Sequence, residues 1–548
     1  MIADKILYHG VFYTEDPKNP FAEAVAINGK KLIYVGDSEG AMALAGPETK
    51  MIDLEGKTVV PGLIDGHLHP ETVSKTWWHA VSRFTYDKEE LLEDIREKAQ
   101  AQPKEKIPYL YYESYFTETF GEKGPDRWML DSAVSDRPAR IDDFTGHACC
   151  YNTKALEMLC DENGVPQVES SLGETEFKKD QNGNYTGWAL EASPDCDRKI
   201  YEKLGWQPPE TVHEEMAKPL LDYLKQYGVM GMMDGYTEGD ENMRFFYEMD
   251  KAGKLGMFFE ASVLLEEVGS LEDSILKVRE WQKKYSTEHV HCNTIKFFAD
   301  GTNEIGDSLS LEPFYNDPEH KYYGHANATA EQIRDVLVRL NEEDIDFHSH
   351  IVGDATFRLM CDGVEMARKI CRNSWRICVG FAHCELIHPD DADRVADLGI
   401  YIDWSTHWAG GFFGTAAQAF LGKERWESMY DFSRILETGG KVGFSSDIYT
   451  YWEAPRADPW FGMQVSMTRK DPWFPLDPEK FEGSVRLPLR ARLTKEQLLA
   501  GYTAVNAERL RLSDRMGSIE AGNLANLVVL EQDIKELPPE RFGEINVL

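Results

Sequence analysis

Eight short apolar runs, each typical of a buried β-strand, recur along the chain between segments with helical spacing, and this alternation limits the fold more than any other feature. Strands that alternate with helices build parallel α/β structures, and eight strands close a TIM barrel. The runs are 59–70, 228–234, 258–264, 294–301, 345–350, 377–383, 400–404 and 441–447. The sequence therefore predicts an α/β fold built on a (β/α)8 barrel.

The two ends of the chain carry a different pattern. Residues 1–58 alternate apolar and polar positions between turn signals, and Asn28-Gly29 favours a hairpin, so we expect a small antiparallel sheet there. A second β-like piece covers 517–530. Because each piece needs a partner to bury one face, we predict one small β-sandwich made from residues 1–58 and 510–548.

The barrel is then expected over residues 59–509, with an insertion at about 71–220 between its first two strands. That interval is far longer than one crossover helix, so it predicts an inserted lid subdomain. Inside it, 87–98 reads as a charged amphipathic helix and 180–184 as a turn.

Composition excludes some classes of partner. The formal charge of −36 argues against binding to nucleic acid or to an anionic membrane surface, both of which are negatively charged. We find neither a signal-peptide pattern nor an apolar run of membrane-spanning length, so the expected location is the cytoplasm. The nine cysteines form no CxxC pair, which favours reduced, mostly buried thiols.

Five side chains at the predicted strand ends can bind a metal. His67 and His69 are alternate residues of one strand and face the same side, while His350, His383 and Asp447 end three other strands. Because the carboxyl ends of barrel strands form one face, these side chains are expected to converge there. Imidazoles with a carboxylate hold zinc or a similar divalent ion and leave a position open for water. Such an ion lowers the pKa of water from 15.7 to about 7, and Asp447 is predicted to accept the proton.

Some assignments stay open. A cationic Lys296 is unfavourable beside a metal, but a carboxylated Lys296 is an anion that can bridge two metals; the alternative is an anchor for the substrate or for a carboxylate. His348 competes with His350 for the fifth-strand position, and we prefer His350 because it lies nearer the strand end. His147 follows a glycine that permits close approach of a ligand, so its imidazole either donates to a substrate carbonyl or has a structural role.

Other rings and imidazoles near the predicted site are less specific. Three histidines are expected in loops or in packing: His291, His388 and His407. Aromatic side chains more often belong to the core, but in strand-end loops they suit an apolar substrate pocket. The candidates for substrate binding are Trp77, Trp404, Trp408 and Tyr449.

Together these motifs make the chain resemble a known family, the amidohydrolase superfamily, and in particular its branch of N-substituted formamide deformylase-like enzymes. The resemblance covers nearly the whole chain. It is carried by 60–69 (VPGLIDGHLH), 295–301 (IKFFADG), 350–355 (HIVGDA), 382–383 (AH), 445–447 (SSD) and 517–522 (GSIEAG), and within the insertion by 130–138 (LDSAVSDRP), 146–148 (GHA) and 152–156 (NTKAL).

The resemblance implies a metal-dependent hydrolase with a (β/α)8 barrel and a β-sandwich made from both termini. It also implies one or two divalent ions such as Zn²⁺. In that arrangement His67 and His69 bind one metal, Lys296 is the carboxylated bridge, His350 and His383 complete a second site, and Asp447 is both ligand and base. Enzymes of this kind commonly dimerise, so a homodimer is possible, although no residue pattern indicates an interface.

Two departures from the family pattern stand out. Asn526 occupies a position where the closing motif of the family usually has Asp, which concerns the sandwich. Residues 404–408 (WSTHW) differ from the segment expected after the seventh strand, which affects the substrate specificity.

The leading hypothesis is a hydrolase that cleaves a carbon–nitrogen bond, an amide and in particular an N-formyl or N-acyl group, in a small aromatic or apolar substrate. Asp447 is assigned the protonation of the leaving nitrogen, and His147 a share in stabilising the oxyanion. The alternatives are a metal-dependent lyase, decarboxylase or lactonase on the same barrel, and a non-catalytic protein that binds a small molecule.

Overall fold

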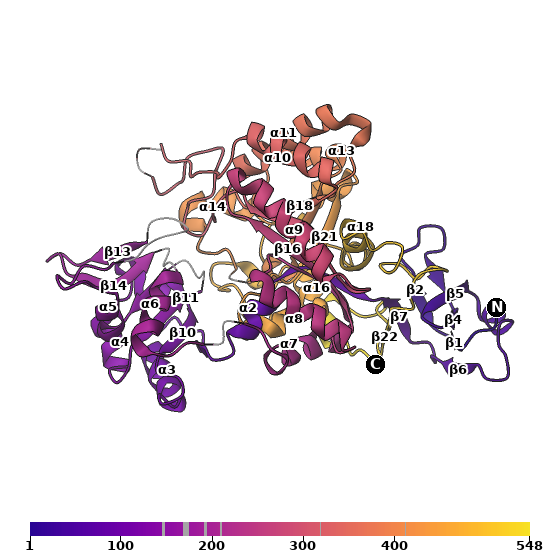
Figure 1. Cartoon of the computed structure of the whole chain (residues 1–548), viewed down its shortest axis with the longest axis horizontal. Helices are drawn as coiled ribbons and strands as arrows, with labels where there is room; N and C mark the ends of the chain where they lie inside the picture. Colours follow the sequence, from indigo (N-terminus) through magenta and orange to yellow (C-terminus); the bar gives the residue numbers. More distant parts are fainter. Residues whose placement is uncertain are drawn as a thin grey trace. The chain divides into compact units, whose positions relative to one another are not determined.

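The structure is a computed structural model, and it describes residues 1–144, 148–167, 175–190, 194–208, 211–317, 319, 321–411 and 413–548 (Figure 1). The chain divides into two compact units. Unit 1 comprises residues 1–73, 212–449 and 453–548, and unit 2 comprises residues 74–211 and 450–452.

Unit 1 contains an eight-stranded sheet whose strands are hydrogen-bonded in chain order. The strands are β8 (Leu63–Leu68), β15 (Val229–Asp234), β16 (Phe258–Leu265), β17 (Val290–Phe298), β18 (Asp346–Ile351), β19 (Val379–His383), β20 (Tyr401–Ser405) and β21 (Lys441–Ser445). Every neighbouring pair in this order is parallel. The eight predicted strands are therefore confirmed.

The first and last strands of this sheet approach each other at their carboxyl ends. The backbone N–H of Asp447, just after β21, donates to the carbonyl of His67 in β8 at 2.7 Å. In turn, the N–H of His69 donates to the carbonyl of Ile448 at 3.1 Å. These bonds bring the sheet close to a closed ring, as in a TIM-like barrel.

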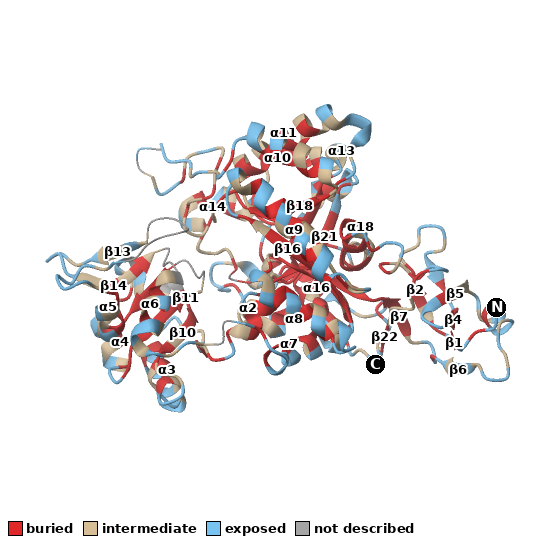
Figure 2. Cartoon of the chain, in the orientation of Figure 1, coloured by how far each residue is buried: buried red, intermediate tan, exposed pale blue. Residues whose placement is uncertain are grey.

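Helices connect successive strands of the barrel. They include α7 (Glu214–Gln226), α8 (Gly239–Lys251), α9 (Leu271–Tyr285), α10 (Ala330–Glu343), α11 (Asp354–Cys371), α12 (Pro389–Ala392), α13 (Arg394–Leu398), α14 (Gln418–Ser428) and α15 (Ser433–Glu437). After β21 come α16 (Pro459–Thr468), α17 (Lys495–Ala500) and α18 (Asn506–Arg509). The strands are buried, whereas the helices carry both buried and exposed positions (Figure 2).

Helix α10 illustrates why these segments are helical. A capping box joins Thr329 and Gln332 at its start, and Asp344 in left-handed conformation ends it. Its buried apolar residues recur at helical spacing: Ile333, Val336, Leu337 and Leu340. Each of them contributes roughly 1.5–3 kcal/mol by leaving water, so the helix is stabilised mainly by its contact with the barrel.

The amino-terminal residues form a four-stranded sheet in the order β5-β4-β1-β6. Its strands are β1 (Lys5–Tyr8), β4 (Ala24–Asn28), β5 (Lys31–Gly36) and β6 (Lys50–Asp53). The Asn28-Gly29 hairpin is confirmed between β4 and β5, with Gly29 at φ 60°. The expectation of a purely antiparallel sheet is wrong, because the chain crosses over through α1 (Ser38–Met42) and β6 returns parallel to β1.

A second four-stranded sheet joins the two ends of the chain, in the order β22-β7-β2-β3. Its strands are β2 (Val11–Tyr13), β3 (Phe21–Ala22), β7 (Thr58–Pro61) and β22 (Leu527–Leu530). The carboxyl-terminal β22 lies antiparallel to β7, as Figure 1 shows at the meeting of the yellow and indigo segments. Leu7 and Val25 of the first sheet share one buried cluster with Phe12 and Val59 of the second.

Unit 2 has its own six-stranded mixed sheet, in the order β13-β14-β12-β11-β10-β9. The strands are β9 (Ala80–Val81), β10 (Leu110–Tyr115), β11 (Ala139–Asp143), β12 (Ala148–Tyr151), β13 (Glu176–Lys179) and β14 (Tyr185–Leu190). The predicted helix at 87–98 corresponds to α3 (Lys88–Ala101), capped by Asp87. The predicted turn at 180–184 joins β13 to β14.

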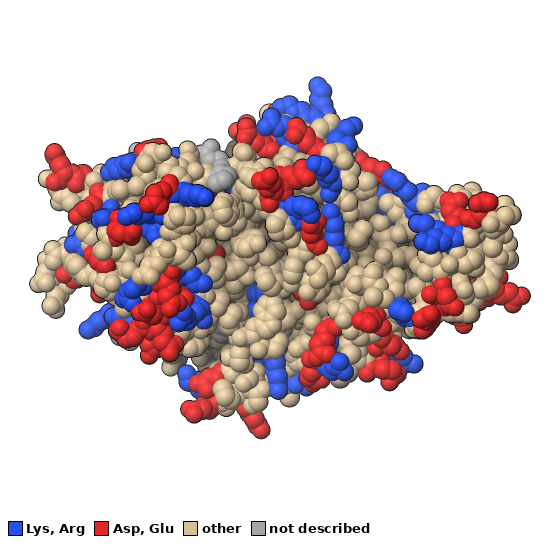
Figure 3. All heavy atoms as spheres, turned by 90° about the horizontal axis from the view of Figure 1, so that it is seen from below, with Lys and Arg blue, Asp and Glu red and all other residues tan. Residues whose placement is uncertain are grey.

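Acidic and basic side chains are mingled on the face drawn in Figure 3. Elsewhere and on this face alike, oppositely charged side chains of the described chain form pairs, for example Lys254 with Glu214 at 2.6 Å and Lys30 with Glu288 at 3.0 Å. On this face the two signs of charge therefore lie side by side.

All nine cysteines are free thiols, and six of them are buried, which confirms the expectation from their spacing. Across the described part of the chain, none of the helices is both long and apolar enough to span a bilayer.

The contact between β22 and the barrel can be tested at Gly228, which directly precedes β15. This glycine has φ +83°, and a Cβ atom there would lie 2.7 Å from Cγ1 of Val528. Gly439 is a matched control with φ +82° and no neighbour within 4 Å. We expect Gly439→Ala to cost about 1 kcal/mol from backbone strain alone. Gly228→Ala should cost a further 1–3 kcal/mol, roughly, from overpacking.

Thermal unfolding followed by circular dichroism measures both variants against the parent. Equal losses of stability in Gly228→Ala and Gly439→Ala would contradict the packing of β22 against this position.

Candidate functional site

The predicted metal ligands gather at the carboxyl ends of the barrel strands. His67 lies in β8, Lys296 in β17 and His350 in β18, while His383 ends β19 and Asp447 follows β21. His69 comes directly after β8. Parallel strands end on the same side of a barrel, which brings residues hundreds of positions apart to one place.

Three of these side chains form a compact group. The candidate ligand atoms of His67, His383 and Asp447 all lie within 4.8 Å of one another. One carboxylate oxygen of Asp447 is 3.6 Å from Nε2 of His67, and the other is 3.3 Å from Nδ1 of His383. Nε2 of His69 is 3.4 Å from the same carboxylate. The Asp447 carboxylate is thus surrounded by three imidazoles.

Lys296 lies beside this group. Its Nζ is 3.4 Å from Nε2 of His67 and 4.9 Å from the centre of the Phe298 ring. The side chain is 1% exposed. Burial lowers the pKa of Lys296 to about 8, although nearby carboxylates oppose the change.

The two candidates on β18 occupy different positions. The ring of His350 is 4.6 Å from that of His383, and its Nε2 is 3.0 Å from the carbonyl of Gly301. His348 lies two residues nearer the start of the strand, with its Nε2 2.9 Å from Nδ1 of His67. His350 therefore packs on the group at the strand ends, while His348 supports His67 from the barrel interior.

Burial keeps three imidazoles of this site neutral. It lowers the pKa of His67, His348 and His383 well below 6.5, and the neighbouring positive charge of Lys296 acts in the same direction. A neutral imidazole offers a lone pair, which is the form that binds a metal.

Two of the site residues have strained backbones. Asp447 has φ 48° and His383 has φ 70°, both in the left-handed region. A residue with a Cβ atom pays roughly 1–2 kcal/mol for this conformation. The hydrogen bond from Asp447 N to His67 O helps to offset that cost.

Two contributors to the site were missed in the sequence. A Cβ atom on Gly235 would lie 2.4 Å from both His67 Nε2 and His69 Cε1, so only glycine fits beside the two imidazoles. Asp65 accepts from the N–H of His67 at 3.2 Å and from the N–H and hydroxyl of Ser446 at 3.1 and 2.6 Å. His348 was weighed in the sequence only as an alternative to His350, whereas in the structure both lie at the site. Gly235 directly follows the end of a barrel strand, and that position in the sequence could have marked it as a site residue.

Aromatic rings contact the histidines. Tyr236 and Tyr449 each lie 5.5 Å from the ring of His69, between ring centres. Phe298 lies 5.3 Å from His350, and Trp408 stacks on His383 at 5.5 Å. Trp408 and Tyr449 had been selected from the sequence, whereas Tyr236 and Phe298 had not.

The structure does not bring the remaining candidates, Trp404, Trp77 and His147, into this group. Trp404 is 1% exposed and packs on Phe432 and Tyr430, because alternation along β20 points Asp403 inward and Trp404 outward. Trp77 belongs to unit 2 and is 51% exposed. His147 lies outside the described residues.

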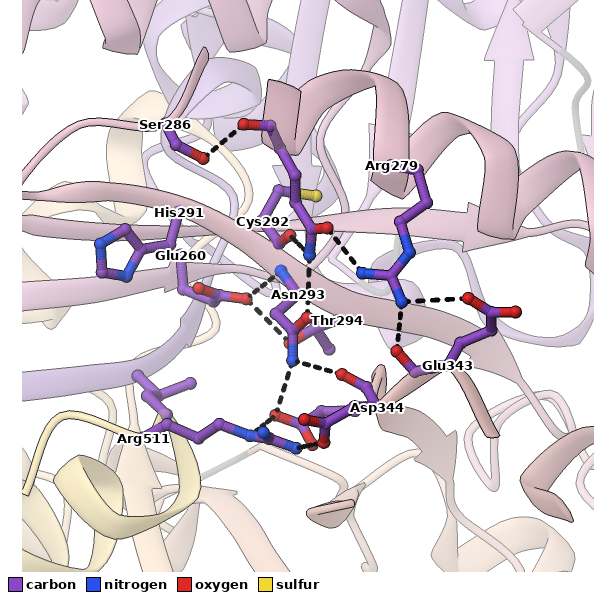
Figure 4. A pocket seen from close by; sticks show the side chains of 13 residues that line it. Glu260, Arg279, Ser286, His291, Cys292, Asn293, Thr294, Glu343, Asp344 and Arg511 are labelled. Atoms are coloured by element: carbon purple, nitrogen blue, oxygen red, sulfur yellow. Dashed lines mark hydrogen bonds and ion pairs between the residues drawn. The ribbon is translucent and has the colours of Figure 1, made fainter. Parts of the chain in front are cut away.

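The other end of the barrel has a cavity of about 610 Å³ at the start of β16, β17 and β18 (Figure 4). Arg511 donates to Asp346 at 2.6 Å and to Asp344 at 2.9 Å. The N–H of Asn293 donates to Glu260 at 2.7 Å. The polar groups that line this cavity are largely bonded to one another, and they tie three strands to the carboxyl-terminal segment.

The chain is similar to known proteins over nearly its whole length. The model of the amidohydrolase family matches residues 50–548. The N-substituted formamide deformylase of Arthrobacter pascens is 23% identical over 100% of this chain and 96% of its own length. The putative amidohydrolase YtcJ of Bacillus subtilis is 24% identical over 99% of this chain and 97% of its own length.

A solved structure shares the fold. It is that of an uncharacterized metal-dependent hydrolase from Pyrococcus horikoshii, with a TM-score of 0.69 and 22% identity over 98% of this chain and 99% of that one. The family match and this similarity confirm the resemblance inferred from the motifs.

The cavity network predicts a pH dependence of stability at Glu260. Burial raises the pKa of Glu260 to about 7, whereas an unfolded Glu titrates near 4.3. Between these values the folded state holds one more proton than the unfolded state, so stability is lost as the pH rises through this window. We expect Glu260→Gln to gain stability relative to the parent by about 2 kcal/mol between pH 5 and pH 8.

Urea unfolding of the parent and of Glu260→Gln at pH 5 and pH 8 measures this difference. A gap between the two proteins that stays constant with pH would contradict the raised pKa.

Proposed function

The chain belongs to the amidohydrolase family; on that premise we propose that it is a hydrolase that uses a divalent metal to cleave an amide carbon–nitrogen bond in a small substrate with an aromatic or apolar part. The observation that carries the proposal is the group of buried His67 and His383 with half-buried Asp447 at the strand ends. Amide hydrolysis needs an activated water molecule and a proton carrier beside it.

The donor set suits a divalent ion. Among the described residues, His67, His383 and Asp447 form the one group of His, Cys, Asp or Glu side chains whose ligand atoms are close enough to hold a cation. Two imidazoles and a carboxylate are ligands that zinc prefers, and His69 supplies a third imidazole next to Asp447. We therefore assign zinc to this group, with His350 available for a second ion.

Lys296 is proposed as a carboxylated bridge between two ions. A buried ammonium group close to His67 would repel a metal, since both carry positive charge. Addition of carbon dioxide to the amine replaces that charge with an anionic carbamate, which suits the same place. The Phe298 ring and the burial of Lys296 leave little water around Nζ.

The residues of the chain divide the chemistry between them. A bound divalent ion supplies an acidified water molecule and polarises the substrate carbonyl. Asp447 lies between His67 and His383, so its carboxylate is placed to take a proton on one side and return it to the leaving nitrogen on the other. His147 is proposed to donate a hydrogen bond to the substrate carbonyl oxygen.

The rings around the site support an aromatic or apolar substrate. Tyr236, Tyr449, Phe298 and Trp408 each contact one of the site histidines. An apolar wall beside the reacting group favours a ligand that buries a ring or an alkyl chain there. An N-substituted formamide, the substrate named for the Arthrobacter pascens relative, combines a small acyl group with such a chain.

The role of Asp447 can be separated from metal binding. We expect Asp447→Asn to retain most of its zinc, because the three imidazoles remain, and to lose kcat by a factor of about 10³. Asp335→Asn, an exposed change in α10, serves as the control for the same substitution. Metal analysis by mass spectrometry and initial rates on the best amide substrate provide the two readouts. Turnover that is unchanged in Asp447→Asn would remove Asp447 as the proton carrier.

The substrate class can be tested with a panel of N-formyl and N-acyl amines, lactones and carboxylic acids. We expect hydrolysis of amides with an aryl or alkyl group on nitrogen, and a rise in KM of about tenfold in Trp408→Ala, equivalent to one lost ring contact. Faster turnover of lactones, or release of carbon dioxide, would instead assign the site to a lactonase or a decarboxylase.

A further inference from the structure

The backbone beside Asp447 is held on both edges of one peptide unit. The N–H of Asp447 donates to the carbonyl of His67 at 2.7 Å. The carbonyl on the opposite edge of this unit, that of Ser446, lies 2.7 Å from Nε2 of His407. His407 belongs to the short helix η4 (Thr406–Ala409), in the segment that departs from the family pattern.

The position of the hydrogen on His407 follows from its other neighbour. Nε of Arg456 lies 2.9 Å from Nδ1 of His407. A guanidinium group has only donors, so Nδ1 must accept. The neutral imidazole then carries its hydrogen on Nε2 and donates it to the carbonyl of Ser446, in agreement with the short distance on that side.

Arg456 is itself fixed. It is 2% exposed and forms a buried ion pair with Asp471. Asp471 accepts in turn from the N–H groups of Trp473 and Phe474 at 2.8 and 3.0 Å. The guanidinium also lies over the ring of Phe413, 4.5 Å from its centre. A rigid series of contacts thus runs from Asp471 through Arg456 and His407 to the carbonyl of Ser446.

This series of contacts ends at the strained backbone of Asp447. Asp447 has φ 48°, and φ is the rotation that sets its side chain against the peptide unit held by His67 and His407. With both edges of that unit bonded, the carboxylate has one position relative to the imidazoles of the site. If the bond on the Ser446 side is lost, the unit can tilt and the left-handed strain can relax.

We propose that His407 is a positioning residue for Asp447, acting through the carbonyl of Ser446 and oriented by Arg456 and Asp471. Its two ring nitrogens are bonded to the carbonyl of Ser446 and to Arg456, and it acts on Asp447 through the backbone. The inference rests on the proposed function for the role of Asp447 as proton carrier. It assigns a role to the histidine of the WSTHW segment, which the sequence alone predicts to be a loop or packing residue.

Two substitutions each remove one of the two hydrogen bonds of His407 and keep the other. His407→Asn keeps an acceptor near Nδ1 for Arg456 but has no donor that reaches Ser446. His407→Gln keeps a donor near Nε2 but loses the acceptor for Arg456. We expect His407→Asn to lower kcat by about 100-fold with KM and zinc content unchanged, as for a misplaced catalytic group. His407→Gln should keep within about tenfold of the parent kcat.

The control is His388→Asn, an exposed N-cap of α12 where asparagine caps equally well, and it should match the parent. A purely structural role for His407 predicts equal losses of kcat in His407→Asn and His407→Gln, in step with their melting temperatures. That result, or a His407→Asn variant with the parent's kcat, overturns the proposal.

The cobalt-loaded proteins give a readout that does not depend on turnover. Movement of the Asp447 carboxylate should change the visible absorption spectrum of Co²⁺ in His407→Asn and leave that of His407→Gln close to the parent. If the parent hydrolyses no amide, the proposed function fails, and this spectrum alone decides the inference: identical spectra for parent and His407→Asn overturn it.

If His407→Asn does not fold, nitrogen-15 spectra of histidine-labelled parent protein decide instead. Assignment of the His407 resonance by comparison with His407→Gln should show an imidazole protonated at Nε2. Protonation at Nδ1 would remove the bond to Ser446 and with it the proposal.

Discussion

The site depends on the contact between the two ends of one parallel sheet. Asp447 follows the last strand and His67 lies in the first, and a backbone hydrogen bond of 2.7 Å joins them directly. Asp65 reinforces the junction by accepting from both His67 and Ser446. Without this contact nothing would fix the position of the Asp447 carboxylate relative to the His67 imidazole, 380 positions away in the sequence. The bonds that close the sheet are therefore the same bonds that assemble the site.

The two ends of the barrel strands carry different groups of side chains. Neutral imidazoles and a buried lysine meet one carboxylate, and aromatic rings contact the imidazoles, so little water reaches these groups. In such surroundings an electrostatic interaction is stronger than in water, which favours binding of a cation and proton transfer over a short distance. At the far end of the same strands, hydrogen bonds to Glu260 and ion pairs of Arg511 link the strands to one another and to the carboxyl-terminal segment.

The sequence alone predicted the barrel strands and selected most of the side chains that converge at their ends, because period-two patterns and polar strand ends are local signals. The eight barrel strands, the Asn28-Gly29 hairpin and the helix that begins after Asp87 were identified in this way. It did not predict Trp404, whose outward direction depends on the register of β20, nor Gly235, whose requirement appears only once two imidazoles approach it. The parallel β6 was missed because pairing across a crossover depends on contacts distant in sequence.

The central claim is that these separated side chains hold one cation. Anomalous X-ray diffraction at the zinc absorption edge, on crystals of the zinc-loaded protein, tests it most directly. The account predicts a strong peak at about 2.0–2.2 Å from an imidazole nitrogen of His67, an imidazole nitrogen of His383 and a carboxylate oxygen of Asp447. A zinc-loaded protein whose only anomalous peaks lie away from these three side chains would contradict it.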